Sequence, residues 1–344
     1  MRAVVVGAGA VGARAARQLH AGDGVEALLI VDADERRAAS VAASLGPGAT
    51  PGRWPDSGTD GWDVVVIASP SGHKAAAEAA LERGAHVVST TDSISEVRSL
   101  LVLDAEARER HLSVVIGAGF SPGLTCLLAR HGAASFDSID ELHIAKAGTG
   151  GPACAHGHHR ALAKGAVDWR DGAWQRRPGG SGRELCWFPD PIGAQDCYRA
   201  ALPEALLLVA PFPGVRRVTA RVAASRRDRL TTRLPMLRRP HPEGLLGAVR
   251  VEVRGAAGGG RDVKVLGALD RPAVAAGAVA AVAASWAVEG RLRRPGAAGL
   301  ADLVAEPIGM LHDLARRGVR AAVFEGADLS PALPQAELKP PSSL

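Results

Sequence analysis

The chain has 344 residues, of which 47% are hydrophobic and only 3% aromatic, and its formal net charge is +5. This length indicates two domains with an aliphatic core. The basic residues are scattered rather than interleaved with aromatic side chains, which argues against nucleic-acid binding and favours anionic small molecules. The four cysteines lack C-x-x-C spacing, no apolar stretch suits a membrane span, and the N-terminus lacks a signal-peptide pattern, so we expect a cytoplasmic protein.

The N-terminus carries the pattern of a dinucleotide-binding unit. An apolar run at 2–6 predicts a buried strand and leads into the G-x-G-x-x-G motif Gly7-Ala8-Gly9-Ala10-Val11-Gly12. A helical stretch and a second apolar run follow, and that run ends at Asp32. In such units the first glycine permits the turn, the second admits a pyrophosphate to the backbone, and the third allows close packing of helix and strand. The helix N-terminus attracts phosphate and the terminal acid binds the ribose, so we predict cofactor contacts from Gly7, Gly9, Ala10, Val11, Gly12 and Asp32.

Strands and helices continue to alternate as far as residue 116. Apolar runs at 63–68, 85–89 and 112–116 predict buried strands, and helices are expected at 34–45, 73–83 and 94–110. The Gly- and Pro-rich stretch 46–61 predicts a loop with at most one short strand. This alternation is typical of a doubly wound parallel sheet, so the sequence predicts an α/β fold with an N-terminal Rossmann domain over residues 1–122.

The pattern changes in the second half of the chain. Alternating segments at 138–147, 215–224, 247–255 and 261–269 predict strands, mostly antiparallel, with a helix at 271–289 packed on their sheet. We therefore expect a second α/β domain over residues 123–299, which binds substrate. A helix within 300–330 is expected to return to the first domain, and the tail 333–344 to be disordered.

Polar residues follow the predicted Rossmann strands at the edge where such sheets bind ligands. Ser69, Pro70 and Ser71 are expected beside the nicotinamide ribose, although an ordinary strand-end turn is the alternative. His73 is expected to face solvent at the start of its helix. Asp92 has two equal interpretations, a substrate-binding carboxylate or an N-cap of the helix at 94–110.

The turn at 119–125 is expected to form the floor of the cleft. Ser121, Pro122 and Gly123 would contact the substrate there, and the helix N-terminus at Leu124 would face a substrate carboxylate.

A second group of candidates lies in the run Cys154-Ala155-His156-Gly157-His158-His159. These residue types suit a metal site, which needs three or four converging ligands and a supporting shell, but we predict a loop of the substrate cleft. Because histidine titrates near neutrality, His156, His158 and His159 are the acid/base candidates, and Arg160 is the partner of a substrate carboxylate. Lys146 is a further candidate base. The alternative for the histidines, Arg160 and Lys146 is that they are ordinary solvent-exposed side chains without a role in catalysis.

Several segments in chain order resemble the saccharopine dehydrogenase family. The family's G-x-[DAS]-P-G-x-[ST]-like turn reads Gly119-Phe120-Ser121-Pro122-Gly123-Leu124-Thr125 here, and two later similar segments are Trp187-Phe188-Pro189-Asp190-Pro191-Ile192-Gly193 and Asp270-Arg271-Pro272. The resemblance implies a Rossmann domain, a substrate domain that also forms a homodimer interface, and no metal. It also implies oxidation or reduction at an amine-bearing carbon.

Two departures from that family bear on the cofactor and the turn. Many members end the second strand with Ser-Arg, which suits a 2′-phosphate, whereas Asp32 would repel one. NAD is therefore expected, with NADP possible through Arg36 and Arg37. Saccharopine reductases often have Asp where this chain has Ser121.

Residues 63–88 are also similar to the glucose–fructose oxidoreductase and inositol dehydrogenase group. That group continues with Glu-Lys-Pro, whose Lys serves catalysis, whereas this chain has Ser89-Thr90-Thr91-Asp92. We therefore predict an NAD(P)-dependent oxidoreductase that transfers hydride at a C–N carbon of an amino-acid-derived substrate. A sugar or polyol dehydrogenase and a non-catalytic dinucleotide-binding protein are the alternatives.

Overall fold

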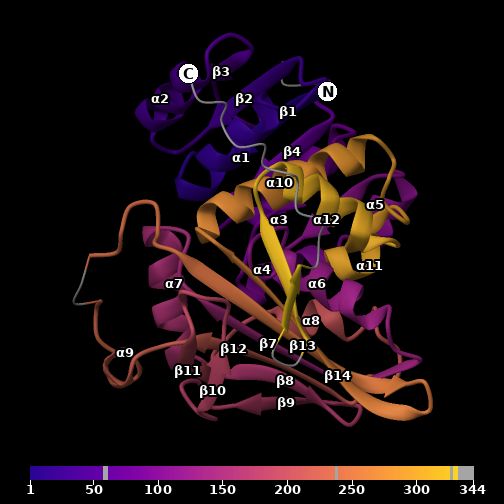
Figure 1. Ribbon diagram of the computed structural model, residues 1–344. Helices are drawn as coiled ribbons and strands as arrows, with labels where there is room; N and C mark the ends of the chain where they lie inside the picture. Colours follow the sequence, from indigo (N-terminus) through magenta and orange to yellow (C-terminus); the bar gives the residue numbers. More distant parts are fainter. Residues whose placement is uncertain (57–60, 237–238, 326–327, 332–344) are drawn as a thin grey trace, which may run out of the picture.

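The protein consists of two β-sheets with helices between them (Figure 1). The computed structural model describes residues 1–56, 61–236, 239–325 and 328–331, so the tail expected to be disordered lies outside the described residues. Within these ranges no helix is both long and apolar enough to cross a membrane.

The first sheet is the predicted Rossmann sheet. Its seven strands are all parallel and have the spatial order β15-β6-β5-β4-β1-β2-β3. Their bounds are β1 Arg2–Val6, β2 Ala27–Val31, β3 Ala49–Pro51, β4 Val64–Ile67, β5 His86–Ser89, β6 Ser113–Ile116 and β15 Gly296–Ala298. The central strands are buried on both faces, which explains their unbroken Val and Ile runs.

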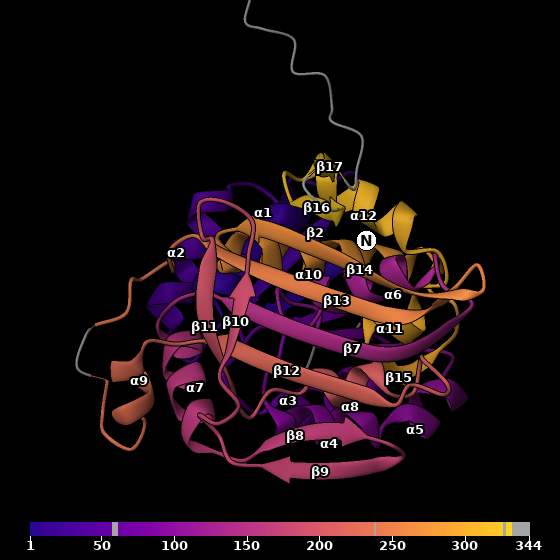
Figure 2. The ribbon, with the colours of Figure 1, turned by 60° about the horizontal axis from the view of Figure 1, so that its bottom comes forward.

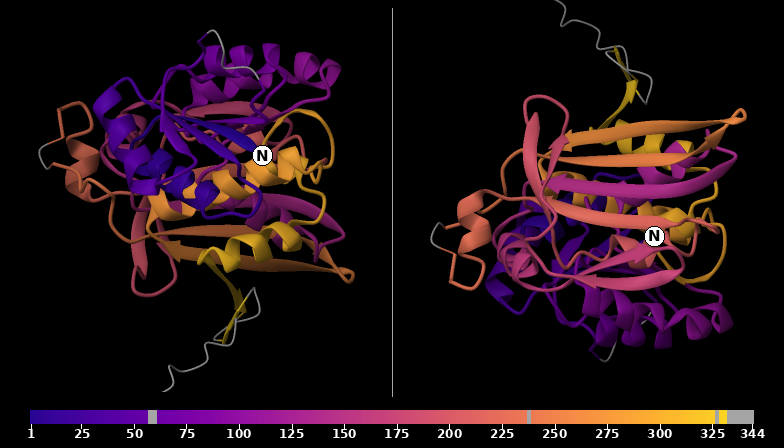
Figure 3. Two further views of the ribbon diagram at one scale, coloured as in Figure 1. Left: turned by 90° about the horizontal axis from the view of Figure 1, so that it is seen from above. Right: turned by 90° about the horizontal axis from the view of Figure 1, so that it is seen from below.

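Helices cover both faces of this sheet (Figure 3). They are α1 Ala10–His20, α2 Glu35–Leu45, α3 His73–Glu82, α4 Ile94–Leu101 and α5 Asp104–Glu109. The single helix expected at 94–110 is thus two helices. The break lies at Val102, which ends the first helix, and Leu103, which precedes the second.

The second sheet is mixed and larger, and Figure 2 shows its outer face. Its main path runs β10-β11-β12-β7-β13-β14-β16-β17, with β8 and β9 attached beside β12. The neighbouring strands are antiparallel except for β12 and β7, which are parallel. The bounds are β7 Ser138–Ala147, β8 Ala166–Arg170, β9 Ala173–Arg177, β10 Glu184–Trp187, β11 Ala194–Arg199, β12 Arg217–Ala223, β13 Gly247–Ala257, β14 Gly260–Asp270, β16 Arg320–Glu325 and β17 Asp328–Pro331. The predicted fold class, a Rossmann domain plus a mostly antiparallel α/β domain, is confirmed.

The remaining helices lie between or beside the sheets. They are α6 Leu124–Ala133, α7 Pro152–Ala163, α8 Glu204–Leu208, α9 Arg226–Leu230, α10 Pro272–Val288, α11 Leu300–Leu303 and α12 Pro307–Arg316. The sequence predicts that α10 packs on the second sheet; the helix lies between the two sheets (Figure 3), along α1 and against β4 and β5 of the first. Gly277 explains the close approach, because a Cβ there would lie 2.6 Å from the Cβ of Arg14. The helix is apolar on every side because it is buried between two layers.

The C-terminal part of the chain crosses between the two sheets. β15 pairs with β6 in the first sheet, although the expected boundary placed residues 296–298 in the second domain. α12 packs on α6 and α10, and β16 then joins β14 in the second sheet. Arg317 nevertheless donates a hydrogen bond to the Gln18 carbonyl in α1, at 2.6 Å. The segment 300–330 therefore connects both domains rather than returning to the first alone.

Candidate functional site

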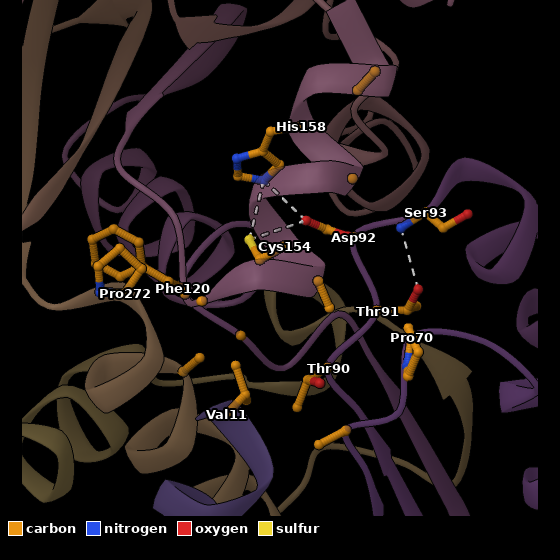
Figure 4. A pocket seen from close by; sticks show the side chains of 18 of the residues that line it. Val11, Pro70, Thr90, Thr91, Asp92, Ser93, Phe120, Cys154, His158 and Pro272 are labelled. Atoms are coloured by element: carbon orange, nitrogen blue, oxygen red, sulfur yellow. Dashed lines mark hydrogen bonds and ion pairs between the residues drawn. The ribbon is translucent and has the colours of Figure 1, made fainter. Parts of the chain in front are cut away.

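A cavity of about 1020 Å³ opens at the carboxyl ends of the Rossmann strands, where the second domain faces them. Its walls come from the β1–α1 turn, the segments after β4 and β5, the 119–121 turn, the end of β7 and helix α7. Figure 4 shows this region from close by. Strand ends of a doubly wound sheet are the expected place for a ligand, so the cavity is the candidate site.

The glycine motif shapes one end of the cavity. Gly7 has φ +101°, and a Cβ there would lie 2.6 Å from the Ser69 nitrogen. At Gly9 a Cβ would meet nothing within 4 Å, so open space lies over the backbone where a pyrophosphate would approach. Gly9 also caps α1 without a side-chain hydrogen bond, which leaves the helix N–H groups for an anion. Ala10 and Val11 line the cavity beside it.

Gly12 does not line the cavity. A Cβ there would lie 1.7 Å from the Gly7 carbonyl oxygen, so this glycine lets α1 pack against the turn. The structure thus shows for Gly12 the packing role expected of the third glycine rather than a place in the cavity wall.

Asp32 lies at the end of β2 and lines the cavity. Its carboxylate accepts hydrogen bonds from the Ala8 nitrogen at 2.7 Å and the Asp34 nitrogen at 2.9 Å. These two bonds fix the carboxylate, and Oδ2, which accepts only from Ala8 among the described residues, retains a lone pair for a ribose hydroxyl. Arg37 lies 3.5 Å from Asp32 and also lines the cavity, whereas Arg36 does not.

The segment after β4 meets the cavity through Ser69 and Pro70, whereas Ser71 does not line it. Ser69 Oγ instead donates to the Ser71 carbonyl at 2.9 Å, which closes the turn. His73 was expected in solvent but is buried, with Nδ1 2.8 Å from Ser89 Oγ and Nε2 2.8 Å from the Ser69 carbonyl. Burial lowers the pKa of His73, so the ring is neutral. Its two hydrogen bonds connect the end of β4 to the end of β5.

The 119–125 turn contributes only part of what was expected. Ser121 lines the cavity, but Pro122 and Gly123 do not. The Leu124 nitrogen donates to the Gly119 carbonyl at 2.9 Å, and Leu124 itself is fully buried. The N-terminus of α6 is thus closed on its own turn and faces the core, so the expected carboxylate site there is wrong.

The expected histidine loop is helix α7, and its geometry separates the three histidines. His156 is exposed and bonds the Pro152 carbonyl, while His159 reaches the Leu234 carbonyl at 2.9 Å; neither lines the cavity. Both are therefore corrected as catalytic candidates. His158 lies one helical turn after Cys154, and both side chains face the cavity. Arg160 is exposed and lines the same cavity.

Four ionisable groups converge in the cavity, and Figure 4 shows three of them, Asp92, Cys154 and His158. Asp92 Oδ2 lies 3.0 Å from His158 Nε2, 3.8 Å from Lys146 Nζ and 3.9 Å from Cys154 Sγ. Cys154 Sγ lies 3.5 Å from the same His158 nitrogen. Of the two interpretations of Asp92, the N-cap is excluded, because Ser93 occupies the cap position and Glu96 bonds the Gly72 nitrogen instead.

These neighbouring groups shift one another's pKa values. Burial alone would lower the pKa of His158, but the Cys154 sulfur and the Asp92 carboxylate raise it to about 9. Burial opposes ionisation of Asp92, yet His158 and Lys146 hold its pKa below the usual range. The pKa of Cys154 is also lowered, because His158 outweighs burial. Such perturbed groups in one cavity are typical of an active site.

The 119–121 turn holds the side chain of Lys146 in place. The lysine is buried at the end of β7, and Nζ donates to the Ser121 carbonyl at 3.1 Å. Ser121 Oγ donates to the buried Glu204 at 2.5 Å, which connects the turn to α8. The two hydrogen bonds, from Ser121 to Glu204 and from Lys146 to Ser121, thus position the lysine ammonium beside the Asp92 carboxylate.

Sequence reasoning missed two parts of this cavity. Cys154 was noted only as a metal-like residue, although its i,i+4 spacing to His158 on a helix would have paired the two. The basic side chains Arg98, Lys164 and Arg176 also line the cavity. Their positions depend on α4, α7 and β9, and no local pattern in the sequence indicates that these three elements meet.

Comparisons with known proteins agree with this geometry. Residues 1–114 match the model of the GFO/IDH/MocA oxidoreductase family, described by its NAD-binding Rossmann fold. Apo saccharopine dehydrogenase (L-Glu forming) from Saccharomyces cerevisiae is 14% identical with a TM-score of 0.68, over 94% of this chain and 100% of that one. At that identity the likeness shows a shared fold.

Two further similar structures have lower scores. GenD2 from gentamicin A biosynthesis, in complex with NAD, is 17% identical with a TM-score of 0.47, over 94% and 96% of the two chains. A putative myo-inositol dehydrogenase from Sinorhizobium meliloti 1021 is 11% identical with a TM-score of 0.48, over 92% and 95%. The family-model match and the open glycine turn identify residues 1–114 as an NAD-binding Rossmann domain, and the chain as an NAD-binding oxidoreductase.

Proposed function

We propose that this protein is an NAD-dependent dehydrogenase or reductase that acts at a C–N carbon of an amino-acid-derived substrate. The observation that carries the proposal is the group Asp92, Lys146 and His158, which lies in the cavity that also contains the glycine turn. Bound NAD supplies the hydride acceptor or donor in such chemistry. The protein must then hold the substrate carbon in place and handle one amine proton.

The charges of this group suit an amine. The Asp92 carboxylate is ionised and lines the cavity, so it binds a substrate ammonium or iminium nitrogen. His158, protonated at neutral pH, holds the proton that an imine nitrogen takes up on reduction, and its neutral form accepts that proton in the reverse direction. Lys146 keeps Asp92 ionised and is thus a positioning residue.

A set of basic side chains in the same cavity fits the carboxylate of an amino-acid-derived substrate. Arg98, Arg160, Lys164 and Arg176 line the cavity, and Arg160 forms no hydrogen bond or ion pair among the described residues. A substrate carboxylate would form a charge-assisted hydrogen bond with Arg160. Because Arg160 gives up no partner within the described protein, most of the energy of that bond would favour substrate binding. Ser121, which also lines the cavity, is a further proposed substrate contact.

We also propose a homodimer formed through the outer face of the second sheet. Figure 2 shows that face without covering helices. His143 and Glu252 project from adjacent strands and are buried there although both are polar, because they bond Thr219, Arg250 and Arg254. A sheet face that carries no covering helix and whose polar side chains pair with one another suits contact with the same face of a second copy. Light scattering after gel filtration tests it; a monomer would contradict it.

One observation favours a sugar or polyol dehydrogenase as the second candidate. That group's catalytic Lys follows the strand that corresponds to β5, where this chain has Ser89-Thr90-Thr91-Asp92. Lys146, from β7, places its ammonium 3.8 Å from the Asp92 carboxylate. A lysine beside this strand end is thus available for a hydroxyl proton.

A substrate screen separates the two candidates. NADH and NADPH oxidation would be followed with 2-oxo acids plus amines, and NAD reduction with amino acids, opine-like secondary amines, inositols and glucose. We expect turnover with amines or imines only. If inositol or glucose is turned over faster than any amine, the protein is better described as a sugar or polyol dehydrogenase. Turnover of neither class, with NADH still bound, would favour a non-catalytic dinucleotide-binding protein.

A further inference from the structure

We propose that Cys154 is a thiolate nucleophile paired with the His158 imidazolium, and that it is a site of covalent modification by soft electrophiles and hydroperoxides within the NAD cavity. The inference concerns a thiol that the proposed hydride transfer does not use. The two proposals share the His158 imidazolium, but labelling of Cys154 is measured without turnover, so their failures are distinguishable.

The position of Cys154 favours its thiolate form. It is the third residue of α7, a twelve-residue helix, so the N-terminal helix dipole supports a negative charge there. Its Sγ lies 3.5 Å from His158 Nε2, on the next turn of the same helix. Of the elements packed around it, the segment after β5 contributes Asp92 and β7 contributes Lys146.

The charges in the cluster allow the thiolate and the imidazolium to form together. Lys146 and Asp92 form one ion pair, with Nζ 3.8 Å from Oδ2. His158 Nε2 lies 3.0 Å from the same carboxylate oxygen and 3.5 Å from Cys154 Sγ. Transfer of the thiol proton to His158 therefore adds a second ion pair to the first and leaves the net charge of the cluster unchanged.

A metal ion is the competing explanation, because Asp92, Cys154 and His158 present ligand atoms within 4.8 Å of one another. Two features oppose it. Lys146 Nζ lies 3.8 Å from the carboxylate oxygen that a metal would take. In addition, His158 is 7% exposed, and its buried Nδ1 has no hydrogen-bond partner among the described residues, whereas a metal-bound histidine is normally held by one.

The other three cysteines provide an internal comparison. Cys126, Cys186 and Cys197 are all buried, and none of them lines the cavity. Burial also raises the pKa of Cys126 to about 12. Because only an accessible thiolate reacts readily, modification should be confined to Cys154.

The chemistry balances with the groups present. With iodoacetamide, the S–C bond forms as the C–I bond breaks, and iodide leaves. With a hydroperoxide such as hydrogen peroxide, the S–O bond forms as the O–O bond breaks, sulfur is oxidised to the sulfenic acid, and the released hydroxide takes the His158 proton to become water.

The test is timed alkylation of the full-length protein with iodoacetamide at pH 7, read by peptide mass spectrometry. We expect label on Cys154 well before the other three cysteines. His158→Gln should slow labelling of Cys154 about tenfold, because the imidazolium that holds the thiolate is lost. His156→Gln is the matched control on the same helix and should leave the rate unchanged, since its ring bonds the Pro152 carbonyl away from the cluster.

A measurement on the wild type keeps the proposal falsifiable if His158→Gln does not fold. An ordinary thiol labels about thirtyfold more slowly at pH 6 than at pH 7.5, because its thiolate fraction falls with pH. Cys154 should change much less. A thirtyfold drop, preferential labelling of another cysteine, or equal rates in wild type and His158→Gln would overturn the proposal. So would one tightly bound zinc ion per chain that blocks labelling until it is chelated.

Discussion

Substitution of Gly9 by valine tests the cofactor site without disturbing the fold. A Cβ at this position would meet no heavy atom within 4 Å, and the backbone has φ −74° and ψ −167°, an extended conformation that valine adopts readily. The added methyl groups would occupy the space directly over the N-terminus of α1. We expect Gly9→Val to fold normally and to exclude the pyrophosphate.

The size of the effect follows from the bonds that a displaced pyrophosphate loses. The first turn of α1 offers N–H groups with no side-chain cap, and each hydrogen bond to a charged oxygen contributes about 1.5–3 kcal/mol. Loss of two such bonds weakens binding by at least about 3 kcal/mol, which is on the order of 10²-fold in Kd. The free energy of unfolding should change little.

The assay is NADH titration followed by fluorescence, with thermal unfolding of the apo protein beside it. Gly12→Ala is the matched control, because a Cβ at Gly12 would lie 1.7 Å from the Gly7 carbonyl oxygen. That variant should be destabilised by about 3 kcal/mol through overpacking, even with no cofactor present. Equal NADH affinities of wild type and Gly9→Val, with both proteins folded, would refute the assignment of this turn to the pyrophosphate.

Four further predictions concern the rest of the cavity. Asp32→Ser should raise the ratio of NADP to NAD affinity, since it removes a carboxylate that would repel a 2′-phosphate; an unchanged ratio would mean that Asp32 does not contact the ribose. Arg160→Ala should raise KM for a carboxylate-bearing substrate about tenfold with little change in kcat, and an unaltered KM would place the carboxylate elsewhere. The pKa of His158 is about 9, so reductive turnover should fall as pH rises through about 9, and His158→Gln should lose both this limb and about 10²-fold in kcat/KM. Elemental analysis of protein purified without chelator should find no stoichiometric zinc.

The Rossmann half of the molecule could be predicted from local sequence alone. Its strands are short runs of Val, Ile and Ala that are buried on both faces, and its cofactor turn needs glycines at fixed spacing. Both signals lie within a few neighbouring residues. The motif therefore indicated the strand, the turn, the helix and Asp32 in the correct order.

The candidate active site depended on contacts that no local pattern contains. Asp92, Lys146 and His158 come from three elements, and they meet only because the end of β7 and helix α7 pack over the end of β5. Sequence analysis predicted a loop where α7 lies, because Gly157 and three histidines obscure the helical periodicity of its apolar residues. As a helix it directs His158 toward the cavity and His156 away from it, a distinction that residue type cannot make.

The sequence by itself determined the class of the N-terminal domain and its cofactor, because a phosphate-binding turn is a local backbone requirement. Tertiary structure decided which titratable side chains share one cavity and how their pKa values shift, because Coulomb interactions and burial depend on distances between elements far apart in the chain. It also decided where α10 lies, since a helix that is apolar on every side carries no sign of which layer it will pack against.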